Sequence, residues 1–293
     1  MLQVDNINRS FGSKRVLTDV SFTVGGGRMT GFVGANGAGK TTTMRIILGV
    51  LSADSGRVSL DGADLGDTDR RRFGYMPEER GLYPKMKVAE QIVYLARLHG
   101  LTPAAAQRNT TQLLERLGLE ERADTTVESL SLGNQQRAQI AAALVHDPEI
   151  LVLDEPFSGL DPIAVETVQG VLKDRAASGA PVLFSSHQLD IVERLCDDLV
   201  VIADGAVRAS GSREKLRAEF GESQYELVVT GPAEWVRDEG VETISIDGGH
   251  AVFRADSPDA AQVVLRAALD RGRVLRFAPQ EPSLAQIFRE VIQ

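Results

Sequence analysis

The segment GANGAGKT at residues 34–41 constrains the fold of this chain more than any other feature. It fits the pattern G-x-x-x-x-G-K-[ST], and it lies between a short apolar run, RMTGFVG, and a predicted helix from Thr41 to about Leu51. Glycines allow backbone N–H groups to converge on phosphate oxygens at the positive end of a helix. We therefore expect an α/β core that binds a nucleotide through Gly34, Asn36, Gly37, Ala38, Gly39, Lys40, Thr41 and Thr42.

Two carboxylates follow a second apolar run, ILVLDE at residues 150–155. The run predicts a strand buried on both faces, with Asp154 and Glu155 at the carboxyl end, where open α/β sheets bind their ligands. In the glycine-rich segment, Lys40 is expected to reach the β and γ phosphates and Thr41 to offer a hydroxyl to Mg²⁺. Asp154 would hold the same Mg²⁺, usually through water, and Glu155 would act as general base on the attacking water.

The order of predicted elements divides the chain into two domains. Residues 2–24 alternate apolar and polar side chains, which favours antiparallel strands, and two further strands are expected near GRVSLDG and RFGYMP. The strands near GRVSLDG and RFGYMP are expected to form a pair. A helical subdomain follows at about residues 85–147, and the strand PVLFSS and the hairpin DLVVIADGAVRASG close the first domain near residue 211. Residues 212–293 are predicted to run βαββαβ plus a helix, which indicates a small ferredoxin-like α+β domain.

Composition limits the partners of this chain. Its 293 residues are 43% hydrophobic and 25% charged, which is typical of a folded soluble protein. The formal net charge of −9 provides no general attraction to nucleic acid, so no nucleic-acid partner is expected. The N-terminal sequence lacks the pattern of a secretory signal, and no apolar run approaches the roughly 18 residues of a membrane span. Any role at a membrane would need a separate partner chain.

Taken together, the motifs over about residues 2–211 resemble the nucleotide-binding subunit of an ATP-binding cassette transporter. LSLGNQQR at residues 130–137 occupies the place of that family's signature sequence LSGGQ. SGLD at residues 158–161 is similar to the loop that crosses between subunits, and His187 in FSSHQ matches the family's switch histidine. The resemblance implies a cassette fold with an antiparallel β subdomain and a helical subdomain, with ATP and Mg²⁺ bound.

The resemblance also implies how such a subunit works. Two subunits pair head to tail as a homodimer or heterodimer, so the signature of one faces the ATP of the other, and the pair drives integral-membrane permease subunits. The chain would then lie on the cytoplasmic side of the cell membrane, attached through the permease. The residues with implied roles in binding ATP are His187 at the γ-phosphate, Phe11 on the adenine, and Ser131, Gly133, Asn134 and Asp161, which would contact ATP across the subunit boundary.

Two positions depart from the family pattern. Glu78 stands where the family usually has a glutamine that reaches Mg²⁺ and the attacking water; a carboxylate can ligate Mg²⁺ too, but it adds negative charge beside phosphate. Leu132 replaces the first glycine of the signature. A left-handed backbone would cost leucine about 1–2 kcal/mol, so we predict an ordinary backbone conformation there, with the side chain directed away from ATP.

The function that this resemblance favours is ATP-driven export. Glu78, LSLGNQQ and PSLAQIFREV look like the exporters of drugs, peptides, sodium or polysaccharide that have a detached cassette and a small accessory domain. One alternative is a soluble cassette ATPase that acts on ribosomes or DNA, although the chain has neither a second phosphate loop nor a long coiled-coil insertion. Another is a non-hydrolysing regulator, which the presence of Glu155 and His187 disfavours.

Overall fold

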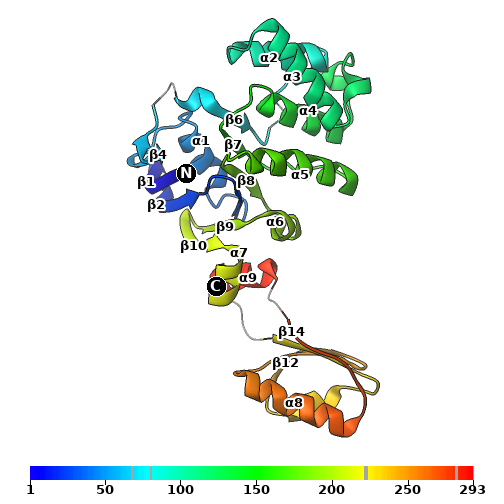
Figure 1. The fold of residues 1–293 in the computed structure, drawn as a ribbon. Coiled ribbons are helices and arrows are strands. Elements are labelled where there is room, and N and C mark those ends of the chain that lie inside the picture. Colours follow the sequence, from blue (N-terminus) through cyan, green and yellow to red (C-terminus); the bar gives the residue numbers. More distant parts are fainter. Residues whose placement is uncertain (67–68, 80, 221–223, 281–282, 293) are drawn as a thin grey trace. The chain divides into compact units, whose positions relative to one another are not determined.

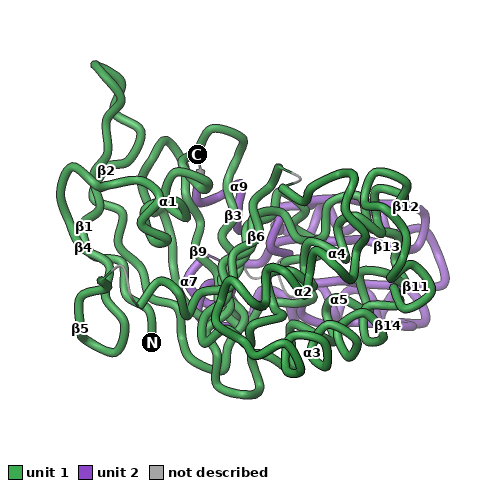
Figure 2. Tube along the Cα trace, turned by 90° about the horizontal axis from the view of Figure 1, so that it is seen from above, with its two compact units in different colours: residues 1–213 green, residues 214–293 purple. Residues whose placement is uncertain are grey.

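The computed structural model describes residues 1–293 except 67–68, 80, 221–223, 281–282 and 293. The chain forms two compact units, Met1–Arg213 and Glu214–Gln293, which Figure 2 shows in different colours. Arg213 is bound to the first unit, because its backbone N–H donates to the Asp197 carbonyl and its guanidinium donates to the Glu193 carbonyl. The sequence-based boundary, residue 211, lies two residues before this junction.

A six-stranded sheet forms the centre of the first unit, in the order β10-β9-β3-β8-β7-β6. Its inner strands are parallel, and β9 and β10 form the predicted hairpin through Asp204 and Gly205, both at positive φ. The strands β3, β7 and β8 are buried throughout, which explains their continuous apolar sequences. The strand bounds are β3 Met29–Val33, β6 Phe73–Met76, β7 Ile150–Leu153, β8 Val182–Ser186, β9 Asp198–Ala203 and β10 Ala206–Ser212.

An antiparallel sheet, in the order β2-β1-β4-β5, forms the second layer of this unit. Its strands are β1 Leu2–Phe11, β2 Lys14–Val24, β4 Ser55–Leu60 and β5 Ala63–Asp64. Apolar side chains from both sheets and from α1 (Lys40–Ile47) share one core, in which the rings of Phe22 and Phe32 lie 5.2 Å apart. The strands expected at GRVSLDG and RFGYMP do not pair with each other: β4 joins this sheet and β6 joins the central one.

Helices α2 to α6 make up much of the first unit outside its two sheets (Figure 1). The helical subdomain contains α2 (Val88–Leu98), α3 (Pro103–Arg116) and α4 (Leu132–Leu144). Thr102 caps α3 by accepting a hydrogen bond from the Ala105 N–H, with Pro103 at the first helical position, as the sequence predicted. The other helices are α5 (Pro162–Ala177) and α6 (Leu189–Leu195), and short 3₁₀ turns cover Asp69–Arg72, Glu120–Arg122 and Val127–Ser129.

The second unit contains a four-stranded antiparallel sheet, in the order β12-β13-β11-β14, packed on its own apolar core. This is the strand order of a ferredoxin-like domain, although its first helix is only the 3₁₀ turn Glu234–Asp238. A helix that the sequence reading left out, α7 (Arg213–Phe220), precedes the sheet. The remaining elements are β11 Gln224–Val229, β12 Glu242–Asp247, β13 His250–Arg254, α8 Pro258–Arg271, β14 Val274–Gln280 and α9 Leu284–Ile292.

Across the described parts of both units, none of the helices combines the length and the apolar character of a membrane span.

Candidate functional site

In the glycine-rich loop between β3 and α1, steric contacts exclude any larger residue at the two glycine positions of the G-x-x-x-x-G-K-[ST] pattern. A Cβ on Gly34 would lie 2.4 Å from the carbonyl oxygen of Ile202, so no larger residue fits there. Gly39, at the N-cap of α1, has a φ of 109°, and its Cβ would lie 2.6 Å from the Leu17 side chain. The loop therefore lies close to β2 and β9.

Lys40 and Thr41, the first two residues of α1, form hydrogen bonds where the loop joins the helix. The Lys40 ammonium donates to the carbonyl oxygens of Gly34 at 2.7 Å and Ala35 at 3.3 Å. The Thr41 hydroxyl donates to a carboxylate oxygen of Asp154 at 2.9 Å. The two segments that the sequence singled out, 113 residues apart in the chain, therefore meet as expected.

Ser185 joins the two acidic residues at the end of β7. Its buried hydroxyl donates to the second Asp154 carboxylate oxygen at 2.5 Å and accepts from the Glu155 N–H at 2.9 Å. Sequence reasoning missed this residue. β7 and β8 pair in parallel with Leu153 opposite Phe184, so Asp154 after β7 lies beside Ser185 near the end of β8. This register is set by the tertiary structure, so the sequence offered no signal for Ser185.

Glu155 combines burial with an unusual backbone. Its φ is 51°, in the left-handed region that residues other than glycine rarely adopt, and its side chain is only 9% exposed. The imidazole Nδ1 of His187 lies 2.9 Å from a Glu155 carboxylate oxygen. The His187 side chain is more than half exposed, so this contact joins a solvent-accessible imidazole to a nearly buried carboxylate.

A cavity of about 360 Å³ brings most of the expected phosphate and metal residues together. Glu78 lies on its wall with Asp154 and Glu155, so three carboxylates share one cavity with the lysines. Nearby, burial raises the pKa of Tyr75, and the Asp154 charge raises it further. The residues that line the cavity are Lys14, Val16, Asn36, Gly37, Gly39, Lys40, Thr41, Thr42, Glu78, Asp154 and Glu155, of which Lys14 and Val16 were not anticipated.

Other expected site residues lie outside this lining. Gly34 and Ala38 belong to the same loop, and His187 touches Glu155. Phe11 is half exposed at the turn between β1 and β2, with the guanidinium carbon of Arg9 lying 4.8 Å from its ring centroid. Asp161 caps α5 by accepting from the Ala164 N–H at 2.8 Å.

The signature-like segment opens α4. Ser131 is the N-cap, and its hydroxyl accepts from the Asn134 N–H at 3.4 Å. Leu132 is the first residue of helix α4, and it is not among the described residues that have a positive φ. The predicted ordinary backbone conformation of Leu132 is therefore confirmed. Its side chain is 57% exposed, and its direction relative to a second subunit's ATP stays a prediction. A Cβ on Gly133 would lie 3.4 Å from the Gly159 carbonyl oxygen, so this segment borders the SGLD loop.

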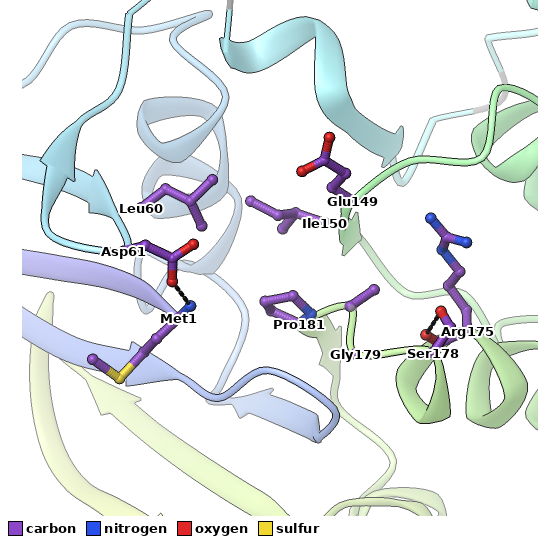
Figure 3. Close-up of a pocket in the computed structure, with 10 residues that line it drawn as sticks. Met1, Leu60, Asp61, Glu149, Ile150, Arg175, Ser178, Gly179 and Pro181 are labelled. Carbon is purple, nitrogen blue, oxygen red and sulfur yellow. Dashed lines mark hydrogen bonds and ion pairs between the residues drawn. The ribbon is translucent and has the colours of Figure 1, made fainter.

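A second cavity, of about 450 Å³, lies at the opposite end of the strands (Figure 3). It is lined by Ile150 at the start of β7 and by Pro181 just before β8, with the N-terminal amine of Met1 paired to Asp61 on its far side. Open α/β sheets bind their ligands at the carboxyl ends of their strands. The cavity beside the glycine-rich loop is therefore the better candidate site.

Two family models match this chain, one within the first compact unit and one over nearly all of the second. The model described as ABC transporter matches residues 17–158. The model described as ATP-binding protein DrrA1-3-like, C-terminal domain, matches residues 211–292.

Individual proteins match over most of the chain. An uncharacterized ABC transporter ATP-binding protein, YhaQ of Bacillus subtilis, is 36% identical over all of this chain and 98% of its own. The Nod factor export ATP-binding protein I of Burkholderia lata is 36% identical over 97% of this chain and 94% of its own. A solved structure, described as the ATP binding subunit of an ABC transporter, has a TM-score of 0.70 at 35% identity, covering 75% of this chain and 93% of that one.

Proposed function

Because the chain belongs to the ATP-binding proteins of ABC transporters, we propose that it hydrolyses ATP and uses the reaction to drive export through separate membrane permease subunits. One observation carries the hydrolytic part of this proposal. Glu155 places a nearly buried carboxylate on the wall of the phosphate cavity, with the His187 imidazole bonded to it. A carboxylate in that place can take a proton from a water that attacks the terminal phosphate.

The residues of the glycine-rich loop would bind the phosphates of ATP through different groups. Lys40 and the loop residues before α1 line the cavity, where their backbone N–H groups and the Lys40 ammonium would hold the phosphates and stabilise charge on the transferring group. In this structure Lys40 bonds to backbone carbonyls, so its charge is not neutralised by those partners. His187, whose imidazole contacts the Glu155 carboxylate, would sense the γ-phosphate.

The donor atoms on one wall of the cavity fit Mg²⁺. They are oxygens, from the Thr41 hydroxyl and from the Asp154 and Glu78 carboxylates, and Mg²⁺ prefers oxygen ligands. Within the described residues, no group of three or more His, Cys, Asp or Glu side chains forms a metal cage by itself. This agrees with an ion that would share its ligands with ATP phosphates and water, where it would offset their negative charge.

A second nucleotide-binding subunit is part of the proposal. Ile163 at the start of α5 is large and apolar, yet it is 78% exposed. It stands two positions after Asp161, one of the residues expected at the subunit boundary. Burial of this side chain against an identical or similar subunit would remove it from water.

Export is the direction that the relatives favour. One relative over nearly the whole chain is a Nod factor export ATP-binding protein, and the C-terminal match to a DrrA1-3-like domain extends the similarity past the cassette. The second unit would then support the dimer or regulate it. In this proposal the exported molecule would be recognised by the permease.

The Glu155→Gln substitution tests the hydrolytic proposal. Steady-state turnover of Mg·ATP by the purified full chain should fall about 10²- to 10⁴-fold, because the amide cannot accept the proton of the attacking water. Binding of Mg·ATP should remain, and the variant should form a dimer under ATP in size-exclusion chromatography. Turnover equal to that of the parental protein would refute the role of Glu155 as base.

Affinity purification from membranes tests the transport proposal. Tagged Glu155→Gln protein, solubilised from its native host in mild detergent with Mg·ATP, should retain an integral-membrane protein of several spans. The Lys40→Ala variant serves as the control that should not bind ATP. Recovery of ribosomes or DNA without a membrane protein would contradict the proposal and favour the soluble-ATPase alternative.

A further inference from the structure

Helix α4, which begins at the signature-like segment, also holds the backbone of the same chain's own phosphate site. Gln136 and Gln139 stand one turn apart on α4, and both are almost fully buried. The Gln136 side-chain amide donates to the carbonyl oxygen of Glu155 at 2.9 Å. The Gln139 amide donates to the carbonyl oxygens of Pro77 at 2.8 Å and Glu79 at 3.1 Å.

The first of these bonds acts on a strained residue. Glu155 has a φ of 51°, and such a backbone persists only where its surroundings hold it. Its N–H donates to Ser185, and its carbonyl accepts from Gln136 and from the Ser158 N–H at 3.1 Å. The peptide groups on both sides of Glu155 are therefore fixed, one by β8 and the other partly by α4. A shift of α4 would change the direction of the Glu155 carboxylate.

The hydrogen bonds of Gln139 act on the backbone around Glu78, another carboxylate that lines the cavity. Pro77 and Glu79 flank Glu78, so the Gln139 amide bridges the carbonyls on either side of it. Glu78 lies two residues after the end of β6, and it lines the cavity with Asp154 and Glu155. Both bonds run from one helix to backbone beside a carboxylate, and both donors are amides that cannot titrate.

We propose that Gln136 and Gln139 are positioning residues that couple α4 to the two carboxylates, Glu155 and Glu78, of the same subunit's ATP site. The inference rests on the proposed function, in which the start of α4 contacts the ATP of a second subunit. Through these amides, engagement of α4 by the partner's nucleotide sets the geometry of hydrolysis in α4's own subunit. The two ATP sites of the dimer thereby affect each other through a single helix.

The matched control is provided by the neighbouring Gln135. Its side-chain amide donates to the carbonyl oxygens of Val127 at 3.2 Å and Leu130 at 3.1 Å, within the helical subdomain. Gln→Met keeps the length of the side chain and removes the donor at each position. The three variants Gln135→Met, Gln136→Met and Gln139→Met therefore differ in which backbone loses its hydrogen bond.

Hydrogen exchange on the full chain, with and without the Mg²⁺ complex of a non-hydrolysable ATP analogue, tests the coupling without any turnover. In the parental protein and in Gln135→Met, the analogue should slow exchange in peptides that cover residues 76–79 and 154–158. Gln139→Met should lose the protection of residues 76–79, and Gln136→Met that of residues 154–158. Protection of residues 34–42 should remain in all three variants.

Turnover provides the second measurement. Gln136→Met and Gln139→Met should lower kcat on the order of 10- to 100-fold, because displacement of a catalytic group by a fraction of an ångström has effects of this size. The KM for Mg·ATP should stay within about threefold, and Gln139→Met should also raise the Mg²⁺ concentration for half-maximal turnover.

The outcomes separate the inference from the function on which it depends. If the parental protein shows no protection of residues 34–42, the proposed nucleotide site itself fails, and the inference fails with it. If the parental protein binds the analogue and both variants keep normal protection and kcat, only the inference is overturned. Equal loss of kcat in all three variants would also overturn it, since the glutamines would then only stabilise the helical subdomain.

Discussion

At the scale of single residues, the geometry of the site depends on Ser185, which contacts both of its acidic residues. Its hydroxyl is fully buried, and both of its hydrogen bonds go to the acidic pair, one to the Asp154 carboxylate and one from the Glu155 N–H. A buried hydroxyl with both partners satisfied stabilises the fold and fixes the carboxylates together. The position thus links the stability of the protein to the geometry of its candidate site.

Ser185→Ala should lower the free energy of unfolding by about 1–3 kcal/mol, since it leaves a buried N–H and a carboxylate oxygen without this partner. Urea unfolding followed by circular dichroism measures the change. Ser178→Ala is the control, because Ser178 is exposed and its hydroxyl donates only to the Arg175 carbonyl, so a small change is expected there. Equal stability of the two variants would contradict the role given to Ser185.

At the scale of elements, two histidines join the ends of α2 and α4 to β6. The rings of His99 and His146 stack with their centroids 3.6 Å apart. His146 Nε2 lies 3.0 Å from the Phe73 carbonyl oxygen, where the neutral ring can donate. Burial, with a smaller contribution from the neighbouring His99, lowers the pKa of His146 to about 4. The contact between the helical subdomain and the central sheet therefore favours the neutral form of His146.

The pH dependence of stability follows from this lowered pKa. His146 titrates at about 4 in the folded protein and near its ordinary 6.5 when unfolded, so the unfolded chain takes up the proton first as the pH falls. The stability from neutral His146 is present above pH 6.5 and is lost progressively between pH 6.5 and 4.

His146→Gln keeps a donor for Phe73 and removes the titration. We expect the stability advantage of the parental protein over this variant, measured by urea unfolding, to shrink as the pH falls from 7 to 4. Measurements at pH 7 and 8 provide the control, since His146 is neutral in both states there. Parallel curves down to pH 4 would show that His146 has an ordinary pKa.

At the scale of the whole molecule, the two units have separate apolar cores, and the first contains every residue of the candidate site. The hairpin of β9 and β10 belongs to the first unit for a specific reason. The Gly205 N–H at its turn donates to the Ala38 carbonyl at 3.1 Å, so the hairpin supports the phosphate loop. The end of β10, rather than the end of the central parallel strands, should therefore mark the shortest functional cassette.

A chain that ends at Arg213 should fold and bind Mg·ATP with a dissociation constant within about threefold of the full chain, since each unit keeps its own core. A chain that ends at Ala203 removes the Gly205 contact and β10, and it should lose ATP binding. Isothermal titration calorimetry and thermal unfolding measure both. Equal affinity of the two truncated chains would refute the support role of the hairpin.

The sequence by itself determined the local features of this protein. The glycine-rich loop, the strand before it, the carboxylates after β7, the N-cap of α3 and the ordinary backbone of Leu132 follow from residues close together in the chain, whose steric and hydrogen-bonding preferences are local. The strand order of the second unit also followed from its predicted elements.

Only the tertiary structure decided which distant segments meet. It placed β4 and β6 in different sheets, left-handed Glu155 between Ser185 and Gln136, and Gln139 beside the Glu78 loop. These pairings depend on how apolar faces are buried together across the whole unit, and the identity of a buried glutamine or serine does not reveal its partner. The residues of the candidate site could therefore be predicted from the sequence, whereas the contacts that position these residues depend on the packing of the folded chain.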